Sequence, residues 1–271
     1  MAAAGWLALP AAAWATICFL LPLAILFATS FQSGDGAPFG VFARIFGDSY
    51  YRDVIANTVV YASVVTFACL VIGYPFALAL VRLPGWLQAI GMIAILLPLT
   101  ASAIVKTFGW TILLRTTGLV NNLLMAIGAI EAPIRILFTL PGLYLGTINM
   151  LLPFMILPIF AVMRRIDPTL LDAAATLRSG PVDRFLRVTL PLSLPGAFAG
   201  FSIVFSLASS AYVIPTLLIG ERHKVLSKVI AHNFLVANDP ALGAGLAVVL
   251  LVFCTSMIAL AARFGRARTE S

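Results

Sequence analysis

The sequence predicts an all-α integral membrane protein, a six-span helical bundle with an additional helix in the polar loop between spans 4 and 5. Of its 271 residues, 62% are hydrophobic and only 10% are charged, whereas about 25% of the residues of a soluble domain are charged. The mean hydropathy of +1.07 agrees with six apolar runs, each long enough to cross a bilayer, which takes about 20 residues. The polar loop is long for a membrane protein and is patterned like a folded element.

The six spans are expected at residues 6–30, 54–81, 87–113, 136–162, 197–219 and 241–263 of a single domain that covers residues 1–271. The first run is longer than the apolar core of a signal peptide and has no basic residue before it, so we expect it to remain as a span. Short helices in the membrane interface are expected around Phe39 to Phe46, where apolar residues fall at helical spacing, and at residues 119–130, which are too few to cross.

The net charge of +7 fits a membrane protein, because Lys and Arg collect in cytoplasmic loops and beside anionic lipid. No nucleic-acid partner is implied. With six spans, both termini lie on one side, together with the loops after spans 2 and 4. That side carries nine basic residues against seven on the other, and this small excess favours cytoplasmic termini and a cytoplasmic loop.

The polar loop at residues 163–196 is capped and patterned as two short helices. Asp167 is expected as the N-cap and Pro168 as the first residue of the first helix. The apolar stripe of that helix comprises Leu170, Leu171, Ala174 and Leu177. Gly180 is expected to end it in the left-handed conformation, and Pro181 to open a second helix that leads into span 5. The alanine-rich middle of the first helix would let another surface come close, either the protein's own bundle or a partner.

No residue pattern supports catalysis, so we do not expect an enzyme. There is no P-loop, and none of the three lysines follows a glycine-rich loop, which excludes ATP binding in the P-loop manner. The histidines and cysteines form no metal-site pattern. None of the predicted spans contains Asp or Glu, which disfavours coupling to an ion gradient. An ion-coupled secondary transporter or channel, and a structural membrane protein, remain open alternatives.

The loop resembles the EAA loop of ABC-importer permeases, the binding-protein-dependent (type I) family. The EAA triplet and the following I-x-L-P positions are occupied in order by Asp172, Ala173, Ala174, Val188, Leu190 and Pro191. Arg178 stands at the position of the family's glycine, and Gly180 follows two residues later. Four further segments, at residues 57–58, 73–75, 118–122 and 213–215, resemble the spermidine/putrescine-type branch.

The resemblance implies a transmembrane permease subunit of an ATP-driven importer in the bacterial inner (cytoplasmic) membrane. Its cytoplasmic coupling helix would dock on an ATPase dimer that holds the ATP and Mg, so this chain is expected to need no cofactor. The implied ATPase-coupling residues are Asp172, Ala173, Ala174, Leu177, Arg178, Gly180, Val188, Leu190 and Pro191. Further implied partners are a second permease, identical or related, an extracytoplasmic solute-binding protein and membrane lipid.

Lys106 is the single charge inside the predicted spans and away from their ends. With Ser206, Ser210 and Tyr212 it forms our candidate lining of a translocation path. Lys106 could instead extend to the interface, and the serines could serve helix packing. Branch members that carry polycations often have a carboxylate at the position of Ala211. The expected solute is small and polar, with polyamine-like, opine or amino-acid-like and phosphonate compounds all open.

Overall fold

The computed structural model describes residues 3–32, 39–167, 169–170, 180–220 and 223–266. Every regular element among these residues is a helix, which confirms the predicted all-α fold. Five helices are long and apolar enough to cross a membrane, and a sixth span is reached if two helices joined by a sharp bend count as one. Among the described residues the predicted helical membrane bundle is therefore confirmed with five or six spans, and the sixth depends on the bent pair.

The chain forms two compact units, residues 1–56 with 226–252 and residues 57–225 with 253–271. The first unit holds α1 (Ala3–Ser30), α2 (Gly40–Gly47), the start of α3 (Ser49–Arg82), α12 (Leu226–Leu235) and the first half of α13 (Pro240–Arg266). The helix expected around Phe39 to Phe46 is α2, which buries Val41 and Ile45 in an apolar cluster with residues of α3, α12 and α13. Beside that cluster, Arg44 Nη1 lies 3.3 Å from Asp239 Oδ2.

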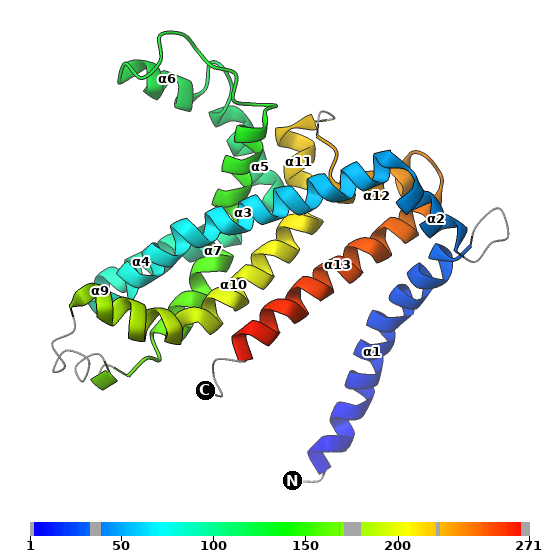
Figure 1. Ribbon diagram of the computed structural model, residues 1–271, viewed down its shortest axis with the longest axis horizontal. Coiled ribbons are helices and arrows are strands. Elements are labelled where there is room, and N and C mark those ends of the chain that lie inside the picture. Colours follow the sequence, from blue (N-terminus) through cyan, green and yellow to red (C-terminus); the bar gives the residue numbers. More distant parts are fainter. Residues whose placement is uncertain (1–2, 33–38, 168, 171–179, 221–222, 267–271) are drawn as a thin grey trace. The chain divides into compact units, whose positions relative to one another are not determined.

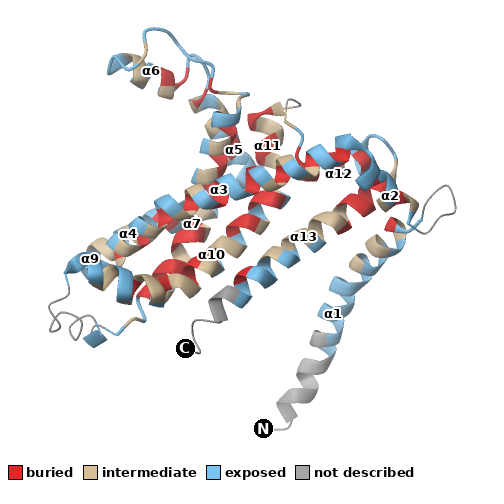
Figure 2. Cartoon of the chain, viewed as in Figure 1, coloured by how far each residue is buried: buried red, intermediate tan, exposed pale blue. Residues whose placement is uncertain are grey.

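The second unit holds the rest of α3 and α13 and all the remaining helices. These are α4 (Gly85–Thr100), α5 (Ala103–Leu113), α6 (Leu119–Ala126), α7 (Leu140–Met163), α9 (Pro181–Arg184), the π-helix η1 (Phe185–Thr189), α10 (Leu190–Ser210) and α11 (Val213–Leu218). α7 lies at its centre and packs against α10, α11, α5 and α4 (Figure 1). Half of the membrane-crossing stretch of α7 is buried in the protein, and Figure 2 shows buried residues along α7 and α10.

The third predicted span, residues 87–113, is not one helix. α4 and α5 meet at an angle of 100°. Pro98 has no N–H and its ring crowds the preceding turn, which weakens the end of α4. Ala101 is then extended, with φ −81° and ψ 140°, and the Ser102 hydroxyl accepts a hydrogen bond from the Ile104 N–H at 3.3 Å as the N-cap of a new helix. The predicted span is thus bent between two helices, because the proline and the cap act together.

The fifth span also differs from its predicted bounds, residues 197–219. A helical stretch runs from Pro181 to Ser210 without a break, so the second half of the polar loop is part of the spanning helix. One turn inside it is a π-turn, in which the Leu190 N–H donates to the Phe185 carbonyl. Pro191 explains this turn, because it has no N–H and its ring would crowd the carbonyl four residues earlier. The helix ends at Ala211, which is extended, and α11 follows separately.

The connection between α5 and α7 is held by one buried side chain. Asn121 Nδ2 donates to the carbonyls of Arg115 and Ile134, at 3.1 and 2.9 Å, and Asn121 Oδ1 accepts from the Ile134 N–H at 2.9 Å. Gly118 precedes α6 where a Cβ atom would lie 2.4 Å from the Leu113 carbonyl oxygen. The segment at residues 118–122 that resembles the family is therefore a structural clamp, and the expected helix at residues 119–130 is α6.

Candidate functional site

The first half of the polar loop begins as predicted. Asp167 Oδ1 accepts a hydrogen bond from the Thr169 N–H at 2.9 Å, so Asp167 caps the helical turn that starts there. Hydrogen bonds from the backbone and the side chain of Thr169 hold the pKa of the Asp167 carboxyl below its usual value. Five of the predicted coupling residues lie outside the described part of the chain: Asp172, Ala173, Ala174, Leu177 and Arg178.

Gly180 has a different role from the predicted one. Its φ of −65° and ψ of 168° are those of extended backbone, and it is the N-cap of α9. The predicted left-handed cap was therefore wrong. Pro181 gives the reason, because a residue that precedes proline is restricted to extended conformations. Pro181 itself opens the second helix, as predicted.

The second half of the loop is fastened to α3. The Tyr74 hydroxyl lies 2.6 Å from Ser193 Oγ, and Ser193 Oγ donates its own proton to the Leu190 carbonyl at 3.0 Å. Tyr74 is therefore the donor to Ser193. The Tyr74 ring also packs edge-on against Phe185, with centroids 6.0 Å apart, so a single tyrosine contacts both the π-turn and α10.

α10 then packs against α7 at very short range. A Cβ atom at Gly196 would lie 2.8 Å from the Pro158 carbonyl oxygen, and one at Gly200 would lie 2.8 Å from the Met155 sulfur. Only glycine allows the two backbones to come this close. Residues 181–189 therefore continue into a helix that is in close contact with α7, the central helix of the unit. The helical stretch from Pro181 to Ser210 is called the arm below. Three of the predicted coupling residues lie on it: Val188, Leu190 and Pro191.

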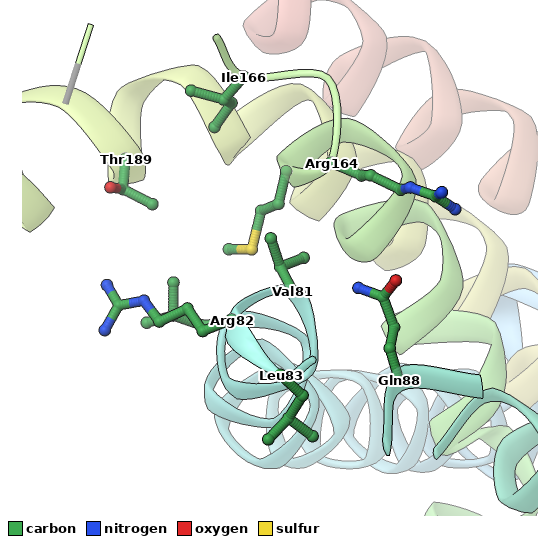
Figure 3. Close-up of a pocket in the computed structure, with 9 residues that line it drawn as sticks. Val81, Arg82, Leu83, Gln88, Arg164, Ile166 and Thr189 are labelled. Carbon is green, nitrogen blue, oxygen red and sulfur yellow. The ribbon is translucent and has the colours of Figure 1, made fainter. Parts of the chain in front are cut away.

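A cavity of about 460 Å³ lies where the loop meets the bundle (Figure 3). It is enclosed by the end of α3, the start of α4, the end of α7 and the π-turn. Figure 3 shows Arg164 and Gln88 on one side of it and Arg82 and Thr189 on the other. None of its lining residues is acidic.

The four candidate path residues lie on α5, α10 and the junction before α11. Lys106 is half-buried near the start of α5, just after the bend, and Trp110 one turn later donates from Nε1 to Asn149 Oδ1 of α7 at 3.3 Å. α11 packs on both α5 and α7. The structure therefore gathers the elements that carry the four residues around α7, but records no contact of the Lys106 ammonium with the other three in the described part of the chain.

The polar groups of these residues are partly available to a solute. The hydroxyls of Ser206 and Ser210 donate to carbonyls of their own helix, each at 2.9 Å, which leaves their oxygens free to accept hydrogen bonds. Tyr212 is exposed, and its carbonyl accepts from the Thr216 hydroxyl at 2.7 Å. The described residues of α5, α10 and α11 include no carboxylate.

Sequence reasoning missed two features of this site. Tyr74 lies in a segment that resembles the family, but its partner Ser193 is 119 residues away, and no local pattern announces the pair. The basic cavity was also missed, although Arg82 and Arg164 follow within two residues of the ends of predicted spans. A charge at that position is a usable signal, because two such ends can meet on one side of the membrane.

Comparison with known proteins places the chain among transporters. A scan against models of protein families finds no match. The spermidine/putrescine transport system permease protein PotB of Escherichia coli K12 is 31% identical over 252 residues, which are 90% of this chain and 91% of that protein. The inner membrane ABC transporter permease protein YdcU of the same strain is 32% identical over 226 residues, 79% of this chain and 72% of that protein.

A solved structure shows the same fold. It is the bacterial alginate ABC transporter in complex with an alginate pentasaccharide-bound periplasmic protein, and the match has a TM-score of 0.80 at 20% identity over 98% of this chain and 94% of that one. Taken with the relatives, this makes the chain a multi-pass membrane protein and a member of the ABC-importer permease family, in its spermidine/putrescine-type branch.

Proposed function

We propose that the chain is the transmembrane permease subunit of an ATP-driven importer and that residues 163–196 receive the motion of a separate ATPase. The observation that carries this proposal is the continuous helix from Pro181 to Ser210. It carries the loop that resembles the EAA loop, without a break in the helix, to the surface of the central helix α7. A loop that only reversed the chain direction would need no such arm.

The ATPase would contact the segment from Asp172 to Leu177, together with Arg178 and Gly180. In this proposal the ATPase is not contacted by Val188, Leu190 or Pro191. They form the stiff part of the arm, because the π-turn at Pro191 is packed against α3 by Tyr74. ATP and Mg would be held by the ATPase dimer, in agreement with the absence of a P-loop from this sequence.

A second permease, identical or related, would complete the pathway, and a solute-binding protein would deliver the solute from outside. Support comes from the alginate transporter, which has this fold and was solved with a periplasmic protein. With cytoplasmic termini, the binding protein would meet the connections at residues 31–53, 115–135 and 220–240. The small excess of basic residues on the opposite side of the membrane favours this orientation.

Lys106, Ser206, Ser210 and Tyr212 would line the path of a small polar solute. The relatives include a spermidine/putrescine permease, which favours a polyamine-like solute. The Lys106 ammonium and the lack of a carboxylate on the described residues of α5, α10 and α11 favour a solute with an anionic group, such as an opine, an amino acid or a phosphonate. Calorimetric binding of each class to the cognate binding protein decides among them.

The coupling proposal is tested by introducing a charge at its proposed contact. Ala173→Glu should abolish co-purification of the ATPase, because a carboxylate would be buried without a partner. Ala237→Glu is the matched control, since Ala237 is exposed in the connection between α12 and α13 and lies on the predicted opposite side of the membrane. Undiminished ATPase binding and solute uptake by Ala173→Glu would contradict the proposal and favour a loop that packs only on its own bundle.

A further inference from the structure

Two adjacent arginines lie at the end of the central spanning helix. Arg164 is the C-cap residue of α7, and its N–H donates to the Phe160 carbonyl at 2.9 Å. Arg165 follows, with its N–H 3.0 Å from the Val162 carbonyl oxygen. Both residues are exposed. Neither guanidinium is recorded in an ion pair with the carboxylates that the structure describes, so two exposed positive charges lie side by side in sequence at the end of this helix.

An apolar groove leads from these arginines along the side of α7. It has a volume of about 540 Å³ and is lined by Met92, Leu157, Phe160 and Ala161, with Arg164 and Arg165 at one end. Met92 belongs to α4 and the other apolar residues to α7. Leu157 precedes Arg164 by seven residues, which places the inner end of the groove about 10 Å along the helix axis from the charges.

Arg164 also lines the cavity of about 460 Å³ described above, so it lies between two hollows. The second hollow adds the guanidinium of Arg82 and the side-chain amide of Gln88, which already donates to the Leu80 carbonyl at 3.2 Å. Among the described residues, no acidic side chain lines either hollow. The charged side chains that line the two hollows are therefore all basic in the described part of the chain.

We propose that this groove binds an anionic phospholipid, with its phosphate on Arg164 and Arg165 and one acyl chain along Leu157, Phe160 and Met92. Basic sites at the ends of spanning helices recognise anionic headgroups, and guanidinium groups pair with phosphate through parallel hydrogen bonds. The carbonyls at a helix C-terminus repel anions, so the two arginines supply the attraction. The site requires only a membrane surface at this end of α7, whichever side that end faces.

The depth of the groove separates a lipid from a protein occupant. A soluble partner reaches the arginines, whereas the apolar lining runs about 10 Å along a helix that is long and apolar enough to cross a membrane. An acyl chain is the apolar ligand that the membrane offers at this depth. A zwitterionic phospholipid fits less well, since its ammonium group would lie beside two guanidinium groups.

The test is native mass spectrometry of the full chain in mild detergent, titrated with phosphatidylglycerol or with phosphatidylethanolamine of the same acyl chains. The double variant Arg164→Gln/Arg165→Gln should bind phosphatidylglycerol about 30-fold more weakly, since each arginine near a membrane surface contributes about fivefold. The matched control is Arg115→Gln/Arg135→Gln, because these exposed arginines also line a cavity, of about 360 Å³. The control should bind like the wild type.

A second variant tests the acyl chain separately. Ala161→Phe fills the groove and keeps both arginines, so it should also lose phosphatidylglycerol. Soluble glycerol phosphate should not compete, because it lacks the acyl chain. Equal binding of the two lipids by the wild type, or undiminished binding by either variant, would overturn the proposal. Loss of the ATPase by the arginine variant with lipid binding intact would assign the arginines to a protein contact instead.

Discussion

The hydrogen bond between Tyr74 and Ser193 fastens the arm of the polar loop to α3, and a double-mutant cycle measures its strength. The variants are Tyr74→Phe, Ser193→Ala and the combination of both. Tyr74→Phe removes one hydroxyl and leaves Ser193 bonded to the Leu190 carbonyl. Ser193→Ala leaves the half-buried Tyr74 hydroxyl without its partner, so it should be the more costly single change.

The expected magnitude follows from depth and geometry. Tyr74 precedes Arg82, the last residue of α3, by eight residues, or about 12 Å along the axis, so the bond lies within the membrane-crossing helix. Side-chain hydrogen bonds inside membrane proteins contribute about 0.6 kcal/mol on average and at most about 1.7 kcal/mol. At 2.6 Å and half-buried, this bond should give an interaction energy of about 1 kcal/mol.

The assay is unfolding of the purified chain in mixed micelles by titration with sodium dodecyl sulfate. Tyr144→Phe is the matched control, because Tyr144 is also half-buried in the apolar core and no hydrogen bond of its hydroxyl is recorded among the described residues. It should change the free energy of unfolding very little. Additive effects of Tyr74→Phe and Ser193→Ala would refute the reasoning, since the two side chains would then not be coupled.

Three further predictions concern packing, the loop clamp and pH. Gly196→Leu should lower the free energy of unfolding by about 1–3 kcal/mol in the same titration, because the new side chain would meet a backbone carbonyl of α7. The control is Gly109→Ala, where no atom lies within 4 Å of the added Cβ atom. It should leave the free energy of unfolding unchanged or raise it by up to about 1 kcal/mol. Asn121→Ala should lower the free energy of unfolding by about 1–3 kcal/mol and speed proteolysis of residues 115–135, because buried backbone groups lose their hydrogen-bond partners. An equal effect of Asn122→Ala, at the exposed neighbouring residue, would contradict this. Because the pKa of Asp167 is lowered, the stabilisation from its cap is present above the usual carboxyl pKa and is lost as the pH falls through the lowered pKa. The NMR signal of the Thr169 amide, which Asp167 caps, should shift over this pH range. Asp167→Asn should remove the pH dependence.

Features decided by neighbouring residues could be read from the sequence. The apolar runs give the spans because their length is set by the bilayer. The Asp167 cap was predicted because a short polar side chain before proline can bond only to the next turn. The start of the second helix at Pro181 was predicted for a similar reason, since its missing N–H costs nothing at a first position.

Features that depend on several elements could not be read. The bend after Pro98 was missed because prolines inside spans are usually tolerated by neighbouring groups, and here Ser102 caps a new helix four residues later. The continuity of the arm with span 5 was not predicted, because it depends on a π-turn that accommodates Pro191 and on contact with α7 that requires Gly196. Tyr74 and Ser193 meet only once α3, α7 and α10 are packed.

The central claim is that this permease is driven through its polar loop by ATP hydrolysis in a partner. It is tested most directly by solute uptake into proteoliposomes that contain the chain, its second permease and the ATPase, with the binding protein outside. Uptake should require hydrolysable ATP and should stop when vanadate traps the ATPase. Uptake of the same solute by the purified chain alone, driven by an ion gradient without ATP, would contradict the claim.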